Sequence, residues 1–505
     1  MPAIGVLDLP AASLARLAAR LRALDYTVDA VIEAIGMSAH RALGRNATAP
    51  AFRALVGRDD PLATLTRLWL LQRTVPATDA ERALGPVLNA LVGADVLARS
   101  GDGVVAVSDL RPYASDDGAS GWVFADLTPG LDGRTAPMRP DYVLGVSSAS
   151  STLAQLVPRE PVGTALDLGT GCGVQSLHLA RHAERVVATD VNPRALAMAR
   201  LTARLNGVDL EVRAGSLYAP VGGERFDLIV TNPPYVMSPP RPPGEGGALT
   251  YREGAFVGDE LVRRVVVEGA AHLNPGGRLQ VLANWAHVVG EDWTERIAGW
   301  VEPTGCDAYV LQRETLDAAE YVELWLADAG LVGTPGYLTA YDGWLDYFAG
   351  LGIEAVGMGW LSLRAAGRDR AYVDLVDWPW AVEQPLGPAF AARDDALDEV
   401  LPLTDAEVLG RRWALASDVV QETIGDPGAT DPQHVVLRQQ RGFRHAEPVD
   451  TAIGGVLGAC DGELALGTIV DAVAQITGVG PADLVPDTLF TVRRLAIRRL
   501  LTCVE

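Results

Sequence analysis

The sequence predicts an α/β protein whose central domain is a mostly parallel sheet of seven strands. A mainly helical, winged-helix-like N-terminal domain and a mainly helical α+β C-terminal domain are expected to flank it. Strand-like and helix-like stretches alternate through residues 161–370, as in parallel sheets that helices cover on both faces. Helical periodicity dominates the stretches on either side. Because 505 residues exceed what one hydrophobic core serves, we expect domains at 1–115, 116–370 and 371–505.

The composition narrows the class of protein. Apolar residues make up 49% of the chain and charged residues 21%, which is typical of folded proteins. The net charge of −22 disfavours a nucleic-acid partner without excluding one, because binding to phosphates needs local cations. The four cysteines and seven histidines lack metal-ligand spacing, so we expect no metal site and a cytoplasmic protein with reduced thiols. We expect no signal peptide and no membrane association, because the first residues lack a basic region and no uncharged run reaches the length of a membrane span.

The N-terminal domain combines helices with a short hairpin. Leucines recur at helical spacing within residues 14–24 and 62–71. A predicted helix over 79–92 precedes a strand–turn–strand pattern over 96–107, whose turn is Ser100-Gly101-Asp102-Gly103. This order is that of a winged helix, which contacts nucleic acid or a partner, or serves as a packing or lid module. The absence of a Lys/Arg cluster on the supposed recognition helix favours packing.

Seven stretches of the central domain have the pattern of buried strands. The last two flank a helical stretch, Leu338–Phe348. The predicted strands are Thr164–Leu168, Arg185–Thr189, Leu210–Arg213, Phe226–Thr231, Arg278–Ala283, Ala308–Gln312 and Ile353–Arg364.

The C-terminal domain is expected to follow a loop rich in proline and tryptophan, Val376–Trp380. It is expected to contain a strand at Val435–Arg438 and helices near Ile469–Ile476 and Thr491–Leu501. It also contains two groups of closely spaced arginines. These arginines contact RNA or form ion pairs with the chain's excess carboxylates, and the second alternative is favoured. They are the arginines of the stretch Arg438–His445 and Arg493, Arg494, Arg498 and Arg499.

A glycine-rich turn, Gly169-Thr170-Gly171-Cys172-Gly173, joins the first predicted strand of the sheet to a helix. Glycines there let the backbone approach a ligand closely, as in dinucleotide-binding folds. The GxGxG spacing, with Asp167 two residues before the first glycine, favours S-adenosylmethionine (SAM) over NAD. The second strand ends at Asp190, where a carboxylate binds the two ribose hydroxyls. The candidate cofactor residues are Asp167, Gly169, Thr170, Gly171, Gly173, Asp190, Val191, Ser216, Leu217 and Asn232.

The fourth strand ends in a second motif, Asn232-Pro233-Pro234-Tyr235. The two prolines fix φ and remove two N–H donors, which leaves the Pro233 carbonyl and the Asn232 side-chain oxygen as acceptors. A planar NH₂ group needs two such acceptors to hold both hydrogens while its lone pair turns toward a methyl group. Tyr235 is placed to stack on a flat substrate group. Preorganised acceptors stabilise the charge that develops, so no strong general base is required.

With these motifs, the stretch from Asp141 to Leu261 resembles class I SAM-dependent methyltransferases. It looks like the glutamine-N5 methyltransferases of peptide-chain release factors, and its NPPY loop is similar to that of adenine-N6 and guanine-N2 methyltransferases. The whole chain resembles an actinobacterial branch with added N- and C-terminal domains. The resemblance implies a Rossmann-like seven-stranded sheet whose final strand inserts antiparallel, SAM as cofactor, and transfer to an amide or amino nitrogen. Many members have an aspartate to bind adenine where this chain has Ser216.

The acceptor stays open at this point. A protein glutamine is favoured, and a nucleic-acid base (adenine N6 or guanine N2) is the alternative. A third alternative is a biosynthetic enzyme of this fold that acts on a small molecule, with or without transferring a methyl group. A binding scaffold with a relic core is disfavoured by the intact motifs. The insertion Ser238–Gly247 is interpreted as a mobile lid or a substrate-selecting loop. The sequence leaves the oligomeric state undetermined.

Two further groups of residues follow the fifth and sixth predicted strands. Trp285, at the end of the fifth strand, is as consistent with the substrate site as with the core. Four residues after the sixth strand are interpreted as a solvated helix face: Arg313, Glu314, Glu320 and Tyr321.

Overall fold

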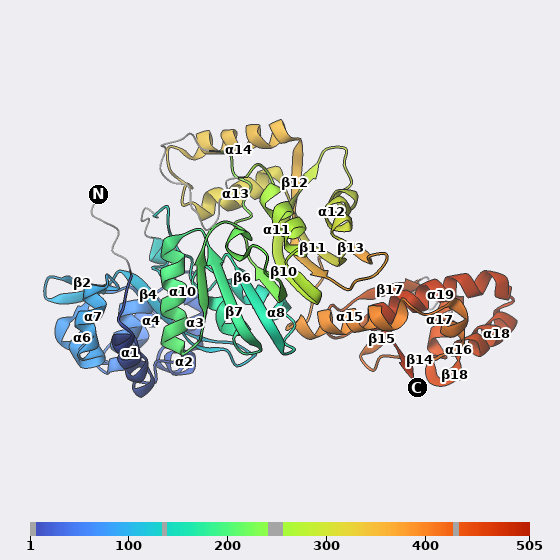
Figure 1. Cartoon of the computed structure of the whole chain (residues 1–505), viewed down its shortest axis with the longest axis horizontal. Helices are drawn as coiled ribbons and strands as arrows, with labels where there is room; N and C mark the ends of the chain where they lie inside the picture. The colour runs from blue at the N-terminus through green and yellow to red at the C-terminus, as the bar shows by residue number, and fades with distance from the viewer. Residues whose placement is uncertain (1–6, 134–138, 241–255, 428–433, 505) are drawn as a thin grey trace. The chain divides into compact units, whose positions relative to one another are not determined.

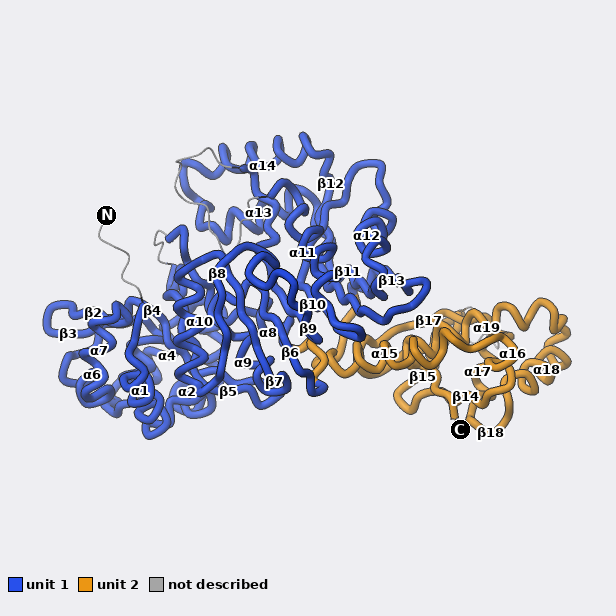
Figure 2. The backbone as a smooth tube through the Cα atoms, in the orientation of Figure 1, with its two compact units in different colours: residues 1–154, 160–379 blue, residues 155–159, 380–505 orange. Residues whose placement is uncertain are grey.

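The computed structural model describes residues 7–133, 139–240, 256–427 and 434–504. The chain forms two compact units, which Figure 2 distinguishes by colour. Unit 1 comprises Met1–Ala154 and Glu160–Pro379, and unit 2 comprises Gln155–Arg159 and Trp380–Glu505. No helix among the described residues is both long and apolar enough to cross a membrane.

An eight-stranded sheet forms the centre of unit 1 (Figure 1), in the order β13-β11-β12-β10-β9-β6-β7-β8. All seven predicted strands are present. Neighbouring strands are parallel except at β12, which pairs antiparallel with both β10 and β11, as the resemblance implies. The strands are β6 (Val162–Leu168), β7 (Ala183–Asp190), β8 (Glu211–Ala214), β9 (Phe226–Thr231), β10 (Leu273–Val288), β11 (Asp307–Asp317), β12 (Ile353–Arg364) and β13 (Val373–Asp377).

The eighth strand, β13, corrects the prediction that the segment from Val376 is a loop. Its backbone pairs in parallel with β11, from Ala308 opposite Val373 to Gln312 opposite Asp377. The loop prediction is wrong for Val376 and Asp377, because the backbone of these residues pairs with Leu311 and Gln312 of β11.

Helices cover both faces of the sheet. On one face, α11 (Glu260–Ala270) and α12 (Trp293–Val301) pack in one buried cluster with strand residues such as Leu166 and Ile229. A separate cluster contains side chains from α9 (Val174–Leu179) and α10 (Pro193–Asn206), together with those of the N-terminal helices. The N-terminal helical region therefore shares a hydrophobic core with the domain that contains the sheet.

The N-terminal region contains the predicted hairpin, but the helix predicted over 79–92 is two helices that are separated at Gly85 and Pro86. Helix α7 (Val87–Gly93) precedes strands β2 (Leu97–Ser100) and β3 (Gly103–Ala106), and β1 (Val75–Pro76) pairs with β3. The helices that come before α7 among the described residues are α1 (Ala11–Ala23), α2 (Val28–Ile35), α3 (Met37–Leu43), α4 (Ala49–Ala54), α5 (Pro61–Leu65) with the π-helical turn Thr66–Leu70, and α6 (Ala77–Leu84). A second hairpin, β4 (Ser108–Ala114) and β5 (Ser120–Asp126), packs on α10, where the Trp122 amide donates to Asn206 Oδ1 at 2.9 Å.

A helical pair, α13 (Ala318–Asp328) and α14 (Tyr337–Leu351), connects β11 to β12. Because β11 is parallel to the core strands, its last residue lies at their carboxyl edge, and the pair lies at that same edge. The pair has its own buried cluster, which includes Val236 and Met237. The helical insertion therefore packs directly on the segment that follows the Asn232–Tyr235 loop.

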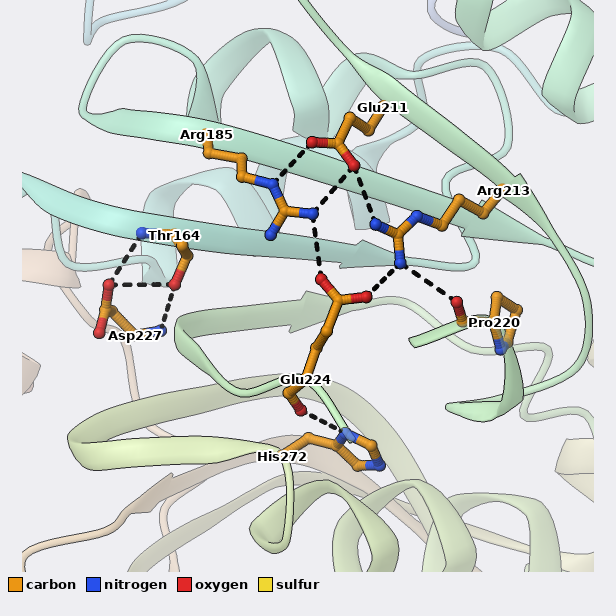
Figure 3. Close-up of polar contacts among 8 residues, drawn as sticks. All are labelled: Thr164, Arg185, Glu211, Arg213, Pro220, Glu224, Asp227 and His272. Carbon is orange, nitrogen blue, oxygen red and sulfur yellow. Dashed lines mark hydrogen bonds and ion pairs between the residues drawn. The ribbon is translucent and has the colours of Figure 1, made fainter. Parts of the chain in front are cut away.

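The opposite, amino-terminal edge of the sheet is held by a network of ion pairs (Figure 3). Arg185 binds Glu211 at 2.6 Å and Glu224 at 3.0 Å, and Arg213 contacts the same two carboxylates. Arg185 holds the pKa of Glu211 well below its usual range, at about 2. Beside this network, Asp227 accepts hydrogen bonds from the Thr164 amide at 2.8 Å and the Asn274 side chain at 2.7 Å. These contacts link the starts of β6, β7, β8, β9 and β10 on the side of the sheet away from the glycine-rich turn.

The described residues of unit 2 form five helices and two small antiparallel sheets. The sheets have the orders β18-β14-β19 and β15-β16-β17. The elements are α15 (Gly387–Val400), α16 (Asp405–Gly410), β14 (Arg412–Leu415), β15 (Val419–Ile424), β16 (His434–Gln439), β17 (Ala446–Val449), α17 (Thr451–Gly458), β18 (Asp461–Ala465), α18 (Leu466–Thr477), α19 (Pro481–Ile497) and β19 (Leu501–Val504).

Most of the unit 2 arginines singled out from the sequence form ion pairs. Arg494 lies 2.8 Å from the buried carboxylate of Glu447, and Arg498 contacts the same carboxylate. The other pairs are Arg438–Glu422 at 2.8 Å, Arg493–Asp405 at 2.9 Å and Arg499–Glu399 at 3.4 Å. The structure therefore favours the ion-pair interpretation of these side chains over RNA contact.

Candidate functional site

A cavity of about 370 Å³ lies at the carboxyl ends of the central strands of unit 1. It is lined by the loops that follow β6, β7, β8 and β9, which meet at one edge because these strands are parallel. Nine of the ten candidate cofactor residues line it: Asp167, Gly169, Thr170, Gly171, Asp190, Val191, Ser216, Leu217 and Asn232. Of the catalytic candidates, Pro233 and Pro234 also line it, and Tyr235 does not.

The glycine-rich turn presents bare backbone to the cavity. Gly169 and Gly171 have φ of 74° and 56°, and a Cβ added at either would meet nothing within 4 Å. The amides of Gly169 and Thr170 donate to the Thr189 carbonyl at 2.9 Å, which ties the turn to the end of β7. Glycine is required here for the left-handed conformation, and its missing side chain leaves room for a ligand.

Gly173 has a different role. It is the N-cap of α9, with φ of 82°, and a Cβ there would lie 3.0 Å from the Cα of Ala199 in α10. It does not line the cavity, so the structure places this candidate in a helix–helix contact.

We expect Gly173→Ala to lower the free energy of unfolding by about 1–3 kcal/mol, because a left-handed backbone and a backbone contact are both penalised. Denaturant unfolding measures this. Gly207→Ala is the matched control, since φ there is 71° and its Cβ would meet nothing within 4 Å. Equal losses in the two variants would contradict a role for the Ala199 contact.

Asp167 lies fully buried beneath the turn and accepts hydrogen bonds at 2.7 Å from the hydroxyls of Thr170 and Ser176. Burial disfavours the charged carboxylate and raises the pKa of Asp167 to about 6, against the effect of these two donors. The hydrogen bonds of Asp167 thus connect the end of β6 to the turn and to α9.

The raised pKa of Asp167 predicts a pH dependence of stability. The folded chain binds this proton more tightly than the unfolded chain, so stability falls as pH rises from about 4 to about 6. The loss amounts to about 2–3 kcal/mol for a shift of roughly two pKa units. We expect the stability difference between the wild type and Asp167→Asn to fall by that amount across this window in denaturant titrations without ligand. A difference that is constant with pH would contradict the assignment.

Asp190 ends β7 at the rim of the cavity. Its Oδ2 accepts the Gly171 amide at 3.0 Å and its Oδ1 accepts the Asn192 amide at 2.8 Å. Burial raises the pKa of Asp190. The carboxylate both lines the cavity and fixes the adjoining turn.

The Asn232–Tyr235 loop closes one side of the cavity. Asn232 Oδ1 is buried and has no hydrogen-bond partner among the described residues. A buried amide oxygen without a partner is costly, so the Asn232 Oδ1 on the cavity wall is a candidate acceptor for a ligand N–H. The Tyr235 ring instead lies half-buried, 6.4 Å from the Trp325 ring of α13, and burial raises the pKa of its hydroxyl.

Several lining residues were not anticipated from the sequence. Tyr142, Val143, Leu144 and Gly145 line the cavity from the segment before α8 (Ser148–Leu156), and Phe256 lines it near α11. None of these positions belongs to a sequence motif, so their place on the cavity wall follows only from the course of the chain in the fold. Residues 241–247 of the predicted insertion lie outside the described residues, as does Tyr251–Gly254 of the stretch that resembles the methyltransferases.

The structure decides two other interpretations. Trp285 is fully buried in the core, with Nε1 donating to Gln312 Oε1 at 3.0 Å, so it does not line the cavity. The prediction of a solvated helix face is confirmed only for Glu320, which is exposed on α13. Arg313 is half-buried and Glu314 is exposed, but both lie in strand β11. Tyr321 is fully buried, so the prediction is wrong for it as well. The sequence could not separate Glu320 from Tyr321, because the turn at which α13 begins decides which of them points inward.

The chain matches known families over two stretches. Residues 144–240 match the family described as methyltransferase small domain, and residues 23–107 match a domain of unknown function, DUF7059. The chain is 30% identical to the release factor glutamine methyltransferase of Geobacter sulfurreducens over 36% of this chain and 72% of that protein. It is 32% identical to the release factor glutamine methyltransferase of Deinococcus radiodurans over 44% of this chain and 81% of that protein. It is also 32% identical to the ribosomal RNA small subunit methyltransferase C of Salmonella arizonae, over 35% and 44% of the two chains.

Proposed function

Because this chain belongs to the class I SAM-dependent methyltransferases, in the family that includes the release factor glutamine methyltransferases, we propose that it methylates a protein glutamine on the amide nitrogen in the cavity of unit 1. The observation that carries the proposal is the Oδ1 of Asn232 on the wall of this cavity, which is buried and has no hydrogen-bond partner among the described residues. It offers an acceptor where a planar NH₂ group needs one.

The cavity residues fit SAM as the cofactor. The Asp190 carboxylate would accept from the two ribose hydroxyls, and the bare backbone at Gly169 and Gly171 would let the cofactor approach closely. The Ser216 hydroxyl and the Leu217 amide are the candidate partners of adenine, since both residues line the cavity and the sequence has no aspartate at 216. Bound SAM supplies an electrophilic methyl group.

The acceptor nitrogen is oriented by the loop. Asn232 Oδ1 and the Pro233 carbonyl would each accept one N–H of the substrate NH₂ group, which turns its lone pair toward the methyl group. As attack proceeds, the nitrogen becomes positively charged and its N–H groups become more acidic, so the same two oxygens bind them more strongly. The chain's contribution is therefore orientation and electrostatic stabilisation, and the nitrogen would lose its proton to solvent after attack.

A protein acceptor is supported by the charge next to the loop. The segment 317–354, which contains the helical pair, carries seven carboxylates and no lysine or arginine. The acidic side chains are Asp317, Glu320, Glu323, Asp328, Asp342, Asp346 and Glu354. Because α13 packs on the residues after Asn232, this charge would repel the phosphates of an approaching nucleic acid.

A nucleic-acid base is the second candidate, favoured by the similarity to the ribosomal RNA methyltransferase. An exocyclic amino group has the same planar NH₂ geometry, so the loop alone does not separate a base from glutamine. A small-molecule amide or amine is the third.

The test is transfer of tritium from methyl-labelled SAM by the full chain, with Asn232→Ala as control. The acceptors are purified release factors and ribosomal RNA of the source organism, together with a small-molecule extract of its cells. Label in a release factor that peptide mapping locates on a glutamine supports the proposal. Label in RNA alone, or in the extract alone, would overturn the acceptor and keep the chemistry. Bound SAM with no label in any fraction would argue against methyl transfer to these classes.

A further inference from the structure

The start of α13 is fixed by its sequence. Asp317 accepts the Glu320 amide at 2.8 Å, and Glu320 accepts the Asp317 amide at 3.2 Å, which is a capping box. The box sets the register of the helix directly after β11. This register turns Tyr321, Val322 and Leu326 inward.

Tyr321 connects the helical pair to two other elements. Its hydroxyl oxygen accepts the Met237 amide at 3.1 Å and the Asn284 side-chain N–H at 2.9 Å. A phenol oxygen has two lone pairs, so both are used. The ring is fully buried, and Tyr321 is not among the residues that line the cavity.

The loop beside the cavity depends on such contacts. Pro233 and Pro234 have no N–H to donate, so the position of the loop rests on the bonds and packing of its neighbours. Met237, five residues after Asn232, is 1% exposed and is bonded to Tyr321. Tyr235 packs on Trp325, one helical turn after Tyr321. The helical pair therefore contacts the loop at two points beyond the prolines.

We propose that Tyr321 is a positioning residue, which holds the segment after Pro234 through Met237 and Asn284 so that the Asn232 and Pro233 oxygens face the acceptor nitrogen. This inference rests on the proposed function for the identity of those oxygens. It assigns to the α13–α14 insertion the task of fixing the loop. It predicts that removing the single hydroxyl impairs transfer while the distant contacts of the cofactor remain.

Tyr321→Phe tests it in the full chain, with three measurements: hydrogen exchange of peptides spanning 231–238, SAM affinity by calorimetry, and kcat with the acceptor that the wild type labels. We expect exchange in this segment to accelerate roughly tenfold, because the Met237 amide loses its acceptor. The kcat should fall roughly 10- to 100-fold, since small displacements of reacting groups have such effects. The SAM dissociation constant should stay within about threefold, because the cofactor contacts lie on the other loops.

Tyr26→Phe is the matched control, since Tyr26 is equally buried and its hydroxyl donates to the Leu110 carbonyl at 3.1 Å, away from the cavity. It should lose stability without changing exchange at 231–238 or kcat. Asn284→Ala is the second variant, which removes one donor and leaves the Met237 bond, so it should produce a smaller increase in exchange.

Unchanged exchange at 231–238 in Tyr321→Phe would overturn the inference, as would a loss of SAM affinity as large as the loss of kcat. If the wild type labels none of the acceptors, the proposed function fails, and exchange and SAM affinity still decide the role of Tyr321.

Discussion

Asn232→Ala is expected to lower kcat by about 100- to 1000-fold, the usual cost of removing one preorganised group that stabilises developing charge. The Asn232 side-chain oxygen is buried and unpartnered in the cavity, so its removal deletes an acceptor without breaking a hydrogen bond among the described residues. The thermal midpoint should therefore change little, and SAM affinity should change by less than about tenfold. Single-turnover transfer with tritiated SAM, alongside calorimetry, measures both quantities.

Asn274→Ala is the matched control for this prediction. It removes the same amide group at the opposite edge of the sheet, where Asn274 donates to Asp227 at 2.7 Å. We expect lower stability and unchanged kcat. Wild-type transfer by a folded Asn232→Ala variant would contradict the role of the loop and favour a binding scaffold.

Asp190→Ala is expected to weaken SAM binding by about 1–3 kcal/mol, because charge-assisted hydrogen bonds to the ribose are lost. This corresponds to a dissociation constant roughly 5- to 150-fold higher. The structure adds a second cause, since Asp190 also accepts the Gly171 amide at 3.0 Å and so holds the glycine-rich turn. Calorimetric titration with SAM measures the loss.

Asp190→Asn separates the two causes, because it keeps one oxygen acceptor for the Gly171 amide and removes the charge. Asp227→Ala is the control, since that carboxylate also accepts a backbone amide, from Thr164 at 2.8 Å, away from the cavity (Figure 3). Unchanged SAM affinity in Asp190→Ala would mean that the cofactor lies elsewhere.

The N-terminal region packs against helices of the domain that contains the sheet. The N-terminal helices share a core with α9 and α10, and α10 begins next to Asp190. The predicted winged-helix pattern thus lies in the same compact unit as the cavity, in agreement with a packing role. The effects of Asn232→Ala and Asp190→Ala can therefore be measured on the full chain, without removing the N-terminal region.

The sequence by itself determined the seven strands, the family, and nine cofactor candidates that line one cavity. It could do so because these features are local. A strand followed by a glycine-rich turn, or by an Asn-Pro-Pro loop, has its conformation fixed by adjacent residues, and parallel strands bring such loops together at one edge.

Only the tertiary structure decided the roles that depend on distant neighbours. Gly173 looks like its two companions in sequence, yet it lies against Ala199 of another helix. Tyr321 looks like part of a solvated face, yet the register of α13 buries it, and its hydroxyl oxygen accepts the Met237 amide. The C-terminal arginines are paired by carboxylates up to about a hundred residues away in the chain. In each case the contact is made by packing between elements, which no local pattern of residues encodes.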